Sequence, residues 1–201
     1  MDKISKVLHS YIPRALEAGP FKPAAVLVPV QERRNGDYLV FTKRADMLSS
    51  HRGHVAFPGG RIEPHDSGPL AAALRETHEE IGIDPCHVRV LGQLDQVTAG
   101  SNYLVSPFVG QIPFPCDFRL NLAETEAVFS VPITALLNPR CLRVEPRSYP
   151  AHRKGEPIYH FYYDGWDIWG ATARIVKQLL ELVYGFDGQD AISVEKPGLN
   201  S

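Results

Sequence analysis

Cysteine is scarce in this 201-residue sequence, and long apolar runs are missing. The three cysteines, Cys86, Cys116 and Cys141, are far apart and form no C-x-x-C pair, which argues against a disulfide framework or a cysteine-based zinc site. The sequence also lacks an apolar run of about eighteen residues and a signal-peptide pattern, so we expect no membrane partner. Together these features predict a cytoplasmic protein.

A large excess of charge of one sign is also missing. The 21 lysines and arginines nearly balance the 23 aspartates and glutamates, which leaves a net charge of −2. Proteins that bind nucleic acids by neutralising their phosphates need a basic excess, so we expect no nucleic-acid partner. The apolar fraction of 44% and the length suit a globular protein with a single domain over residues 1–201.

The densest group of acids lies between residues 59 and 83, which read GGRIEPHDSGPLAAALRETHEEIGI. This stretch has five carboxylates and only two arginines. Proline suits the first position of a helix and glycine suits the left-handed residue that ends one. Pro69 and Gly82 therefore predict a helix over residues 69–81.

This predicted helix has an apolar side and an acidic side. At roughly 100° per residue, the apolar side collects Leu70, Leu74, Thr77 and Ile81, and the acidic side collects Glu76, Glu79 and Glu80. Like charges at this spacing weaken a helix, as do anions near its C-terminal end. A bound divalent cation would offset this repulsion, and Mg²⁺ prefers oxygen ligands. The alternative is a solvated acidic surface.

At these residues the sequence resembles the Nudix box, in which a glycine and a spaced acid precede R-E-hydrophobic-x-E-E-x-G-hydrophobic. Residues 75–83, RETHEEIGI, match its ending, with Thr77 in the first hydrophobic slot. The front half departs, because one residue is added before Arg75 and Asp66 or Ser67 stands where the box has glutamate. The resemblance implies an α/β protein with the Nudix fold, a mixed β-sheet sandwiched between helices, with the loop–helix–loop at residues 59–83.

The added residue and the preceding HVAFPGG resemble the coenzyme A pyrophosphatase branch of the Nudix hydrolases. Upstream, Arg44, His51 and Gly53 match the segment by which that branch is recognised, but Ser49 stands where the branch has a second arginine. Arg52 is the candidate to replace that arginine. The resemblance thus implies that Arg44, His51 and Arg52 bind substrate.

The resemblance implies an enzyme that uses Mg²⁺ or Mn²⁺ to hydrolyse a pyrophosphate bond. We expect Glu76 and Glu80 to be the primary metal ligands, and Glu79 to be a further ligand or the water-activating group. The main-chain carbonyl of Gly59 is expected to bind the metal too, since glycine lets the backbone approach closely. Arg75, which lies four residues before Glu79, is expected to orient or offset the acids.

Glu124 occupies the position of a glutamate that this branch carries shortly before a Val-Pro turn, here Val131-Pro132. It is expected to complete the metal site or to act as a base, and the alternative is an ordinary surface acid. The implied substrate is coenzyme A or a derivative, cut into 3′,5′-adenosine bisphosphate and 4′-phosphopantetheine. Two alternatives stay open: a Nudix hydrolase of NADH, ADP-ribose, a dinucleoside polyphosphate or a nucleotide sugar, and a silent nucleotide-binding sensor. Such sensors typically lose box carboxylates, and all three are present here.

Hydrophobic periodicity predicts the remaining elements. Residues 3–17 have the pattern of an amphipathic helix that packs on the domain or on a second subunit, which leaves a homodimer open. The other expected elements are strands at 24–30, 37–43, 88–97, 103–112, 141–146 and 157–163, and helices at 133–137 and 169–184. Residues 186–201 lose periodicity and are expected to be flexible.

Overall fold

The computed structural model describes residues 1–17, 19–45, 54–100, 102–145, 157–188 and 192–193. Its helices are α1 (Asp2–Ser10), α2 (Pro69–Ile81), α3 (Ile133–Leu136) and α4 (Gly170–Tyr184), with short 3₁₀ turns at Pro85–His87 and Pro139–Cys141. The strands of the larger sheet are β1 (Lys22–Arg33), β2 (Gly36–Arg44), β3 (Val55–Ala56), β4 (Gly59–Arg61), β5 (Arg89–Gln93), β6 (Val97–Ala99), β7 (Tyr103–Gln111) and β8 (Thr125–Pro132). The smaller sheet consists of β9 (Leu142–Glu145), β10 (Ile158–Tyr163), β11 (Trp166–Trp169) and β12 (Ile192–Ser193).

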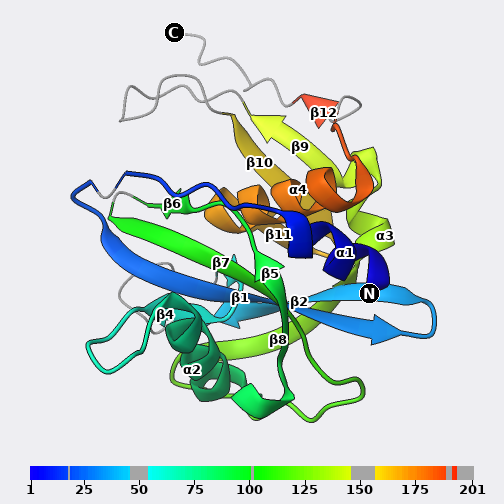
Figure 1. The fold of residues 1–201 in the computed structure, drawn as a ribbon. Helices are drawn as coiled ribbons and strands as arrows, with labels where there is room; N and C mark the ends of the chain where they lie inside the picture. The colour runs from blue at the N-terminus through cyan, green and yellow to red at the C-terminus, as the bar shows by residue number, and fades with distance from the viewer. Residues whose placement is uncertain (18, 46–53, 101, 146–156, 189–191, 194–201) are drawn as a thin grey trace, which may run out of the picture.

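Strand β1 lies at the centre of the larger sheet (Figure 1). It pairs along its length with β7 in parallel, and on its other side it pairs antiparallel with β2 and β4. Strands β1 and β2 form a hairpin, because β2 follows β1 directly and Arg33 pairs with Gly36. The sheet is therefore mixed, and helices cover both of its faces, which confirms the expected sandwich.

Alternation along β1 divides the core between the two faces of the sheet. Ala25 and Leu27 belong to a hydrophobic cluster that includes residues of α2, whereas Val28 and Val30 belong to a second cluster that includes residues of α1, α3 and α4. This is the period of two that a β-strand imposes on its side chains. Because the second cluster joins elements from both ends of the chain, we propose that the described residues form one domain.

Helix α2 has the bounds predicted from Pro69 and Gly82, and Gly82 adopts the expected left-handed conformation with φ 76°. The predicted division into an apolar face and an acidic face is only partly correct. Thr77 and Ile81 are fully buried, but Leu74 is only partly buried, and Glu80 is buried with 3% of its surface exposed. Helical spacing fixes directions around the axis, but it does not say which other elements cover each direction.

Two predicted elements are shorter than expected. The helix expected over 3–17 ends at Ser10, and the residues that follow are not helical, with Ile12 88% exposed. Pro13 explains the early end, since the residue before a proline disfavours helical backbone. The apolar face of α1 packs within this chain, because Ile4 and Leu8 are buried in the core.

The strand expected over 88–97 is broken into β5 and β6. The pairing of β5 with β7 shifts register between Val90 and Gly92, as at a β-bulge. A side chain at Gly92 would meet the Cβ of Leu8 at 2.7 Å, so the close approach of α1 requires glycine there. Apolar alternation gave no sign of this irregularity.

The smaller sheet was predicted only in part. Its strands β9 and β10 were expected, but β11 was not, and Trp169 ends that strand instead of opening the final helix. The expected flexible tail lies mostly outside the described residues, and its described part contains β12 and the buried side chain of Phe186. Helix α4 contacts both β6 of the larger sheet and β10 of the smaller one.

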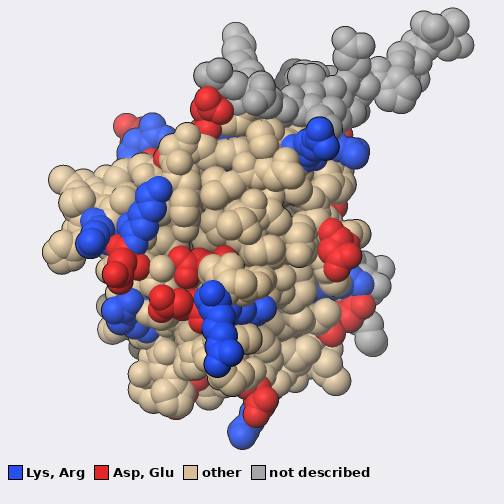
Figure 2. Space-filling model, turned by 90° about the vertical axis from the view of Figure 1, so that its right-hand side faces the viewer, with Lys and Arg blue, Asp and Glu red and all other residues tan. Residues whose placement is uncertain are grey.

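The described surface agrees with the composition. Acidic and basic side chains are interleaved on the face that Figure 2 shows. All three cysteines are free, as expected from their spacing. In the described residues, no helix is long and apolar enough to cross a membrane.

Candidate active site

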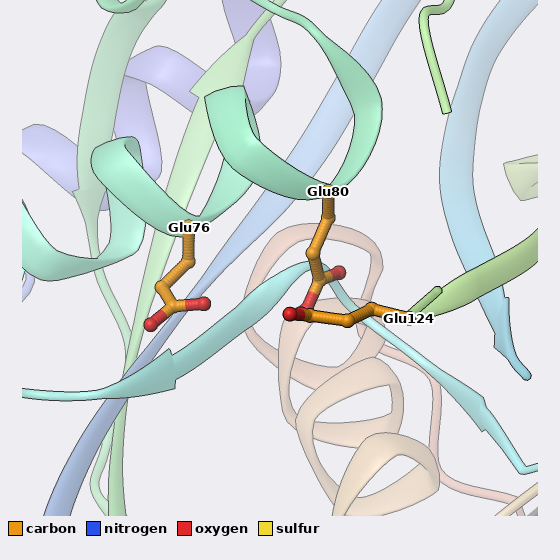
Figure 3. A group of neighbouring side chains, drawn as sticks. All are labelled: Glu76, Glu80 and Glu124. Atoms are coloured by element: carbon orange, nitrogen blue, oxygen red, sulfur yellow. The ribbon is translucent and has the colours of Figure 1, made fainter. Parts of the chain in front are cut away.

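Three carboxylates meet beside α2 (Figure 3). Glu76 and Glu80 project from the helix one turn apart, and Glu124 reaches toward Glu80 from the residue before β8. One carboxylate oxygen from each lies within 4.8 Å of those from the other two. The structure thus groups three of the acids that the sequence nominated, including one that is distant in the chain.

Glu80 is the most deeply buried of the three. Its removal from water is the main cause of a pKa raised to about 8, and the neighbouring Glu76 and Glu124 carboxylates add to this effect. Arg44 and the main-chain N–H of Gly59 act in the opposite direction, and the guanidinium Nη1 of Arg44 lies 4.0 Å from Glu80 Oε1. Burial also raises the pKa of Glu76, against the effect of Arg75.

Arg75 organises the other acids around α2. Its guanidinium donates two hydrogen bonds to Asp66, of 3.0 and 3.1 Å, and one each to Glu76 at 2.9 Å and Glu79 at 3.0 Å. The pair with Arg75 holds the pKa of Asp66 at about 2. Of the two residues that could stand for the glutamate of the box, Asp66 is the one that pairs with Arg75. Because two parallel hydrogen bonds fix a guanidinium more firmly than one, Asp66 holds Arg75 in a defined orientation.

Replacing Asp66 with alanine tests this arrangement. We expect turnover to fall about 10-fold or more, because Arg75 would lose two of its bonds and hold Glu76 less firmly, and small misplacements of catalytic groups are costly. Steady-state kinetics, with circular dichroism to check the fold, measures this effect. Ser67→Ala is the matched control and should keep turnover, whereas equal loss in both variants would contradict a specific role for Asp66.

The carboxylates line a cavity of about 430 Å³. Its wall also contains Arg44 and Arg61, and otherwise it is mostly apolar, with Val26, Val55, Phe57, Val105 and Ile175 among its residues. Helix α4 holds two parts of this wall in place. The Thr172 hydroxyl donates to the Val55 carbonyl at 3.2 Å, and the Arg174 guanidinium donates to the Thr98 carbonyl.

The remaining nominated residues lie as follows. Glu79 is on α2, but its side chain is 51% exposed and pairs with Arg75, so it is not among the three grouped acids. Gly59 opens β4 beside Glu80, whose carboxylate accepts its N–H. His51 and Arg52 lie outside the described residues, as does Ser49.

The three grouped acids fit a hard divalent cation. All the donors are carboxylate oxygens, the ligand type that Mg²⁺ and Mn²⁺ prefer over nitrogen or sulfur. A buried carboxylate such as Glu80 is costly to ionise unless a cation compensates it, and Arg44 at 4.0 Å compensates it only in part. A bound cation would supply the missing positive charge.

Among the residues that line the cavity, sequence reasoning gave no role to three that carry a ring. Tyr103 begins β7, His54 precedes β3, and Trp169 ends β11. The segment around His54 was noticed only for its resemblance to other proteins. Trp169 was noticed only as part of a predicted helix, and Tyr103 only as part of a predicted strand. Nothing in their local patterns indicates that strands distant in the sequence bring them to one cavity.

Comparison with known proteins agrees with the sequence and the fold. The NUDIX domain family matches residues 20–152. The chain is 37% identical over 158 residues to "Uncharacterized Nudix hydrolase NudL" of Enterobacter sp. (strain 638), covering 79% of this chain and 81% of that protein. It is 38% identical over 162 residues to the protein of the same name from Yersinia pestis (strain Pestoides F), covering 80% and 79% of the two chains.

Solved structures support the same fold. A MutT/nudix family protein from Enterococcus faecalis superposes with a TM-score of 0.50 at 12% identity, over 91% of this chain and 74% of that one. At this identity the likeness concerns the fold alone. The matching domain, the relatives over most of the chain and the box carboxylates on α2 together show that this protein belongs to the Nudix hydrolase family.

Proposed function

We propose that this enzyme hydrolyses the pyrophosphate bond of coenzyme A or its derivatives, with Mg²⁺ or Mn²⁺ bound at Glu76, Glu80 and Glu124. The grouping of these three carboxylates in a cavity beside Arg44 is the observation that supports it. Nudix hydrolases act on small nucleotide substrates, and generally use divalent metals. The three free cysteines fit the cytoplasm, where we place the enzyme.

A diphosphate resists attack by water because its own negative oxygens repel the nucleophile. A bound divalent cation supplies charge neutralisation and lowers the pKa of water. The residues of this chain supply the rest. Arg44 lies close enough to Glu80 to contact a phosphate oxygen bound beside it, and Arg75 keeps Glu76 and Glu79 in fixed positions.

We propose Glu124 as the group that accepts the proton of the attacking water. It is partly exposed and lines the cavity, whereas Glu80 is buried. Water can therefore reach Glu124 directly, which a general base requires. Glu79 stays a second candidate for this role or for metal binding, because Arg75 fixes its half-exposed carboxylate near the same site. The main-chain carbonyl of Gly59 is proposed as a further metal ligand.

The choice of coenzyme A rests on the segment before the box. Arg44, His51, Gly53 and the FPGG sequence resemble the coenzyme A branch, and Arg44 lines the cavity. His51 and Arg52, which lie outside the described residues, are proposed to bind the substrate as well. Ser49 stands where the branch has an arginine. Because of this difference, the test includes other substrates.

A substrate panel with resolved products tests this proposal. Coenzyme A, NADH, ADP-ribose, a dinucleoside polyphosphate and a nucleotide sugar are each incubated with Mg²⁺ or Mn²⁺, and the products are separated by chromatography. We expect 3′,5′-adenosine bisphosphate and 4′-phosphopantetheine from coenzyme A at the highest kcat/KM. A higher kcat/KM for another compound would show that this compound, and not coenzyme A, is the preferred substrate. No hydrolysis of any member would favour a nucleotide-binding sensor.

Replacing Arg44 with alanine should raise KM for all diphosphate substrates by similar factors of about 10. Because Arg44 lies 4.0 Å from Glu80, it faces the part that these substrates share, and a charge-assisted contact to phosphate contributes about 1.5 to 3 kcal/mol. KM values for coenzyme A and ADP-ribose measure the effect. Lys22→Ala, at the exposed start of β1, is the control. A rise in KM for coenzyme A alone would contradict this placement of Arg44.

A further inference from the structure

Trp169 is an unusual side chain for its position. It is the last residue of β11 and the residue before α4, it lines the cavity that contains the carboxylates, and 39% of its surface is exposed. Burial of the large apolar surface of a tryptophan side chain is energetically favourable. An indole left open in a cavity therefore has surface available for a ligand.

Neighbouring rings fix the orientation of this indole. The His160 ring lies nearly parallel to it, with centroids 6.0 Å apart and planes at 10°. The His54 ring meets it edge-on at 4.8 Å and 62°. His160 is held in turn by Asp167, whose carboxylate lies 3.0 Å from Nδ1. A ring held from two directions loses little conformational entropy when a ligand binds to it.

Trp166 provides a contrast on the same strand. Its ring stacks on Phe129 with centroids 4.1 Å apart and planes at 5°, and it packs against the hydrophobic core. It does not line the cavity. The ring of Trp166 thus packs against other residues of the protein, whereas part of the surface of Trp169 stays exposed.

The cavity wall combines two chemical characters. Its charged groups include the three carboxylates and Arg44, and much of the remaining wall is apolar. A substrate that fits has an anionic part, which Arg44 and a divalent cation held by the carboxylates would bind, and a flat or apolar part. The nucleobase of a nucleotide is such a part, because each base has a π-face that stacks on aromatic rings.

We propose that Trp169 is the stacking surface for the nucleobase of the substrate, and so a specificity-determining residue. This inference rests on the proposed function only in taking a nucleoside diphosphate as substrate. It assigns the base to Trp169, and the diphosphate to Arg44 and the divalent cation that the carboxylates would hold. Base–aromatic stacking affects affinity by about 5- to 100-fold per base.

Binding of two probes tests the assignment without any turnover. ADP carries a base and a diphosphate, whereas inorganic pyrophosphate has the diphosphate alone. The chain has two tryptophans, so Trp166→Phe leaves Trp169 as the sole indole fluorophore and keeps a ring against Phe129. In this variant with Mg²⁺, we expect ADP to quench the fluorescence and pyrophosphate to leave it nearly unchanged.

Calorimetry on substituted proteins completes the test. Trp169→Ala should raise the Kd of ADP about 10-fold and leave that of pyrophosphate unchanged, and Trp169→Phe should restore most of the ADP affinity. Circular dichroism confirms that each variant is folded. Unchanged ADP affinity in Trp169→Ala, or equal quenching by both probes, overturns the inference. Quenching by ADP in a protein that does not hydrolyse coenzyme A keeps the inference and refutes only the proposed substrate.

Discussion

Replacing Glu80 with glutamine is expected to reduce turnover by at least about 100-fold, the size of effect seen when one preorganised charge-stabilising group is removed. Glutamine keeps the size of the side chain but cannot carry the negative charge that a cation needs. Steady-state kinetics over a range of Mg²⁺ concentrations measures the loss. Turnover close to wild type at saturating Mg²⁺ would remove Glu80 from the metal site.

The same substitution is expected to stabilise the metal-free protein at pH 8. The folded pKa of Glu80, about 8, lies above its unfolded value, so the folded state binds more protons between about pH 4.5 and 8. Stability is thus fully present below the unfolded pKa and falls as pH rises through this window. Since one pKa unit corresponds to about 1.4 kcal/mol, Glu80→Gln should recover on the order of 4 kcal/mol at pH 8.

Urea unfolding at pH 5 and pH 8, in EDTA, measures this difference. We expect wild type to lose stability between the two pH values, and Glu80→Gln to lose much less. Glu63→Gln is the matched control, because that exposed glutamate in the preceding loop should change neither turnover nor the pH dependence. Parallel pH dependence in wild type and Glu80→Gln would show that Glu80 is not the group responsible.

Alanine substitutions at the adjacent residues Gly59 and Gly60 are expected to have different effects, the first on stability and the second on turnover. A Cβ at Gly60 would lie 2.5 Å from the Glu76 carboxylate, the far end of a flexible side chain. A Cβ at Gly59 would lie 2.3 Å from the Ala25 carbonyl oxygen and 2.6 Å from the Val26 Cα, both backbone atoms of β1. Gly59 also has φ 154°, which disfavours alanine.

Gly60→Ala should therefore keep its melting transition nearly unchanged and lose about 100-fold in turnover, because Glu76 must move out of place. Gly59→Ala should lose about 3 kcal/mol of stability or more, because the β1–β4 pairing must shift. Thermal unfolding and kinetics on both variants separate the two effects. Full activity in Gly60→Ala would show that the position of Glu76 is not critical.

Most of the local structure of the site could be predicted from the sequence. Pro69 and Gly82 set the bounds of α2, and helical spacing placed Glu76 and Glu80 one turn apart. It did not reveal that Glu80 is buried, because Arg44, Gly59 and Glu124 come together around its side chain only in the folded chain. Burial depends on elements distant in sequence, and periodicity in one segment contains no information about them.

The larger scale of the fold was harder to predict. Resemblance supplied the mixed sheet, and alternation supplied its long strands, but the short strands β3, β4 and β11 have too few residues for a recognisable period. Trp169 was assigned to a helix because its apolar neighbours follow helical spacing. The extended backbone that ends β11, with φ −137°, instead turns its indole toward the cavity.

The two hydrogen bonds of α4 to the cavity wall span 117 and 76 residues of sequence. A ribosome releases Val55 and Thr98 long before it synthesises Thr172 and Arg174. The nascent chain therefore carries Glu76, Glu80 and Glu124 while the cavity beside them still lacks the part of its wall that α4 supplies. A complete cavity requires that α4 has been synthesised and has packed in place.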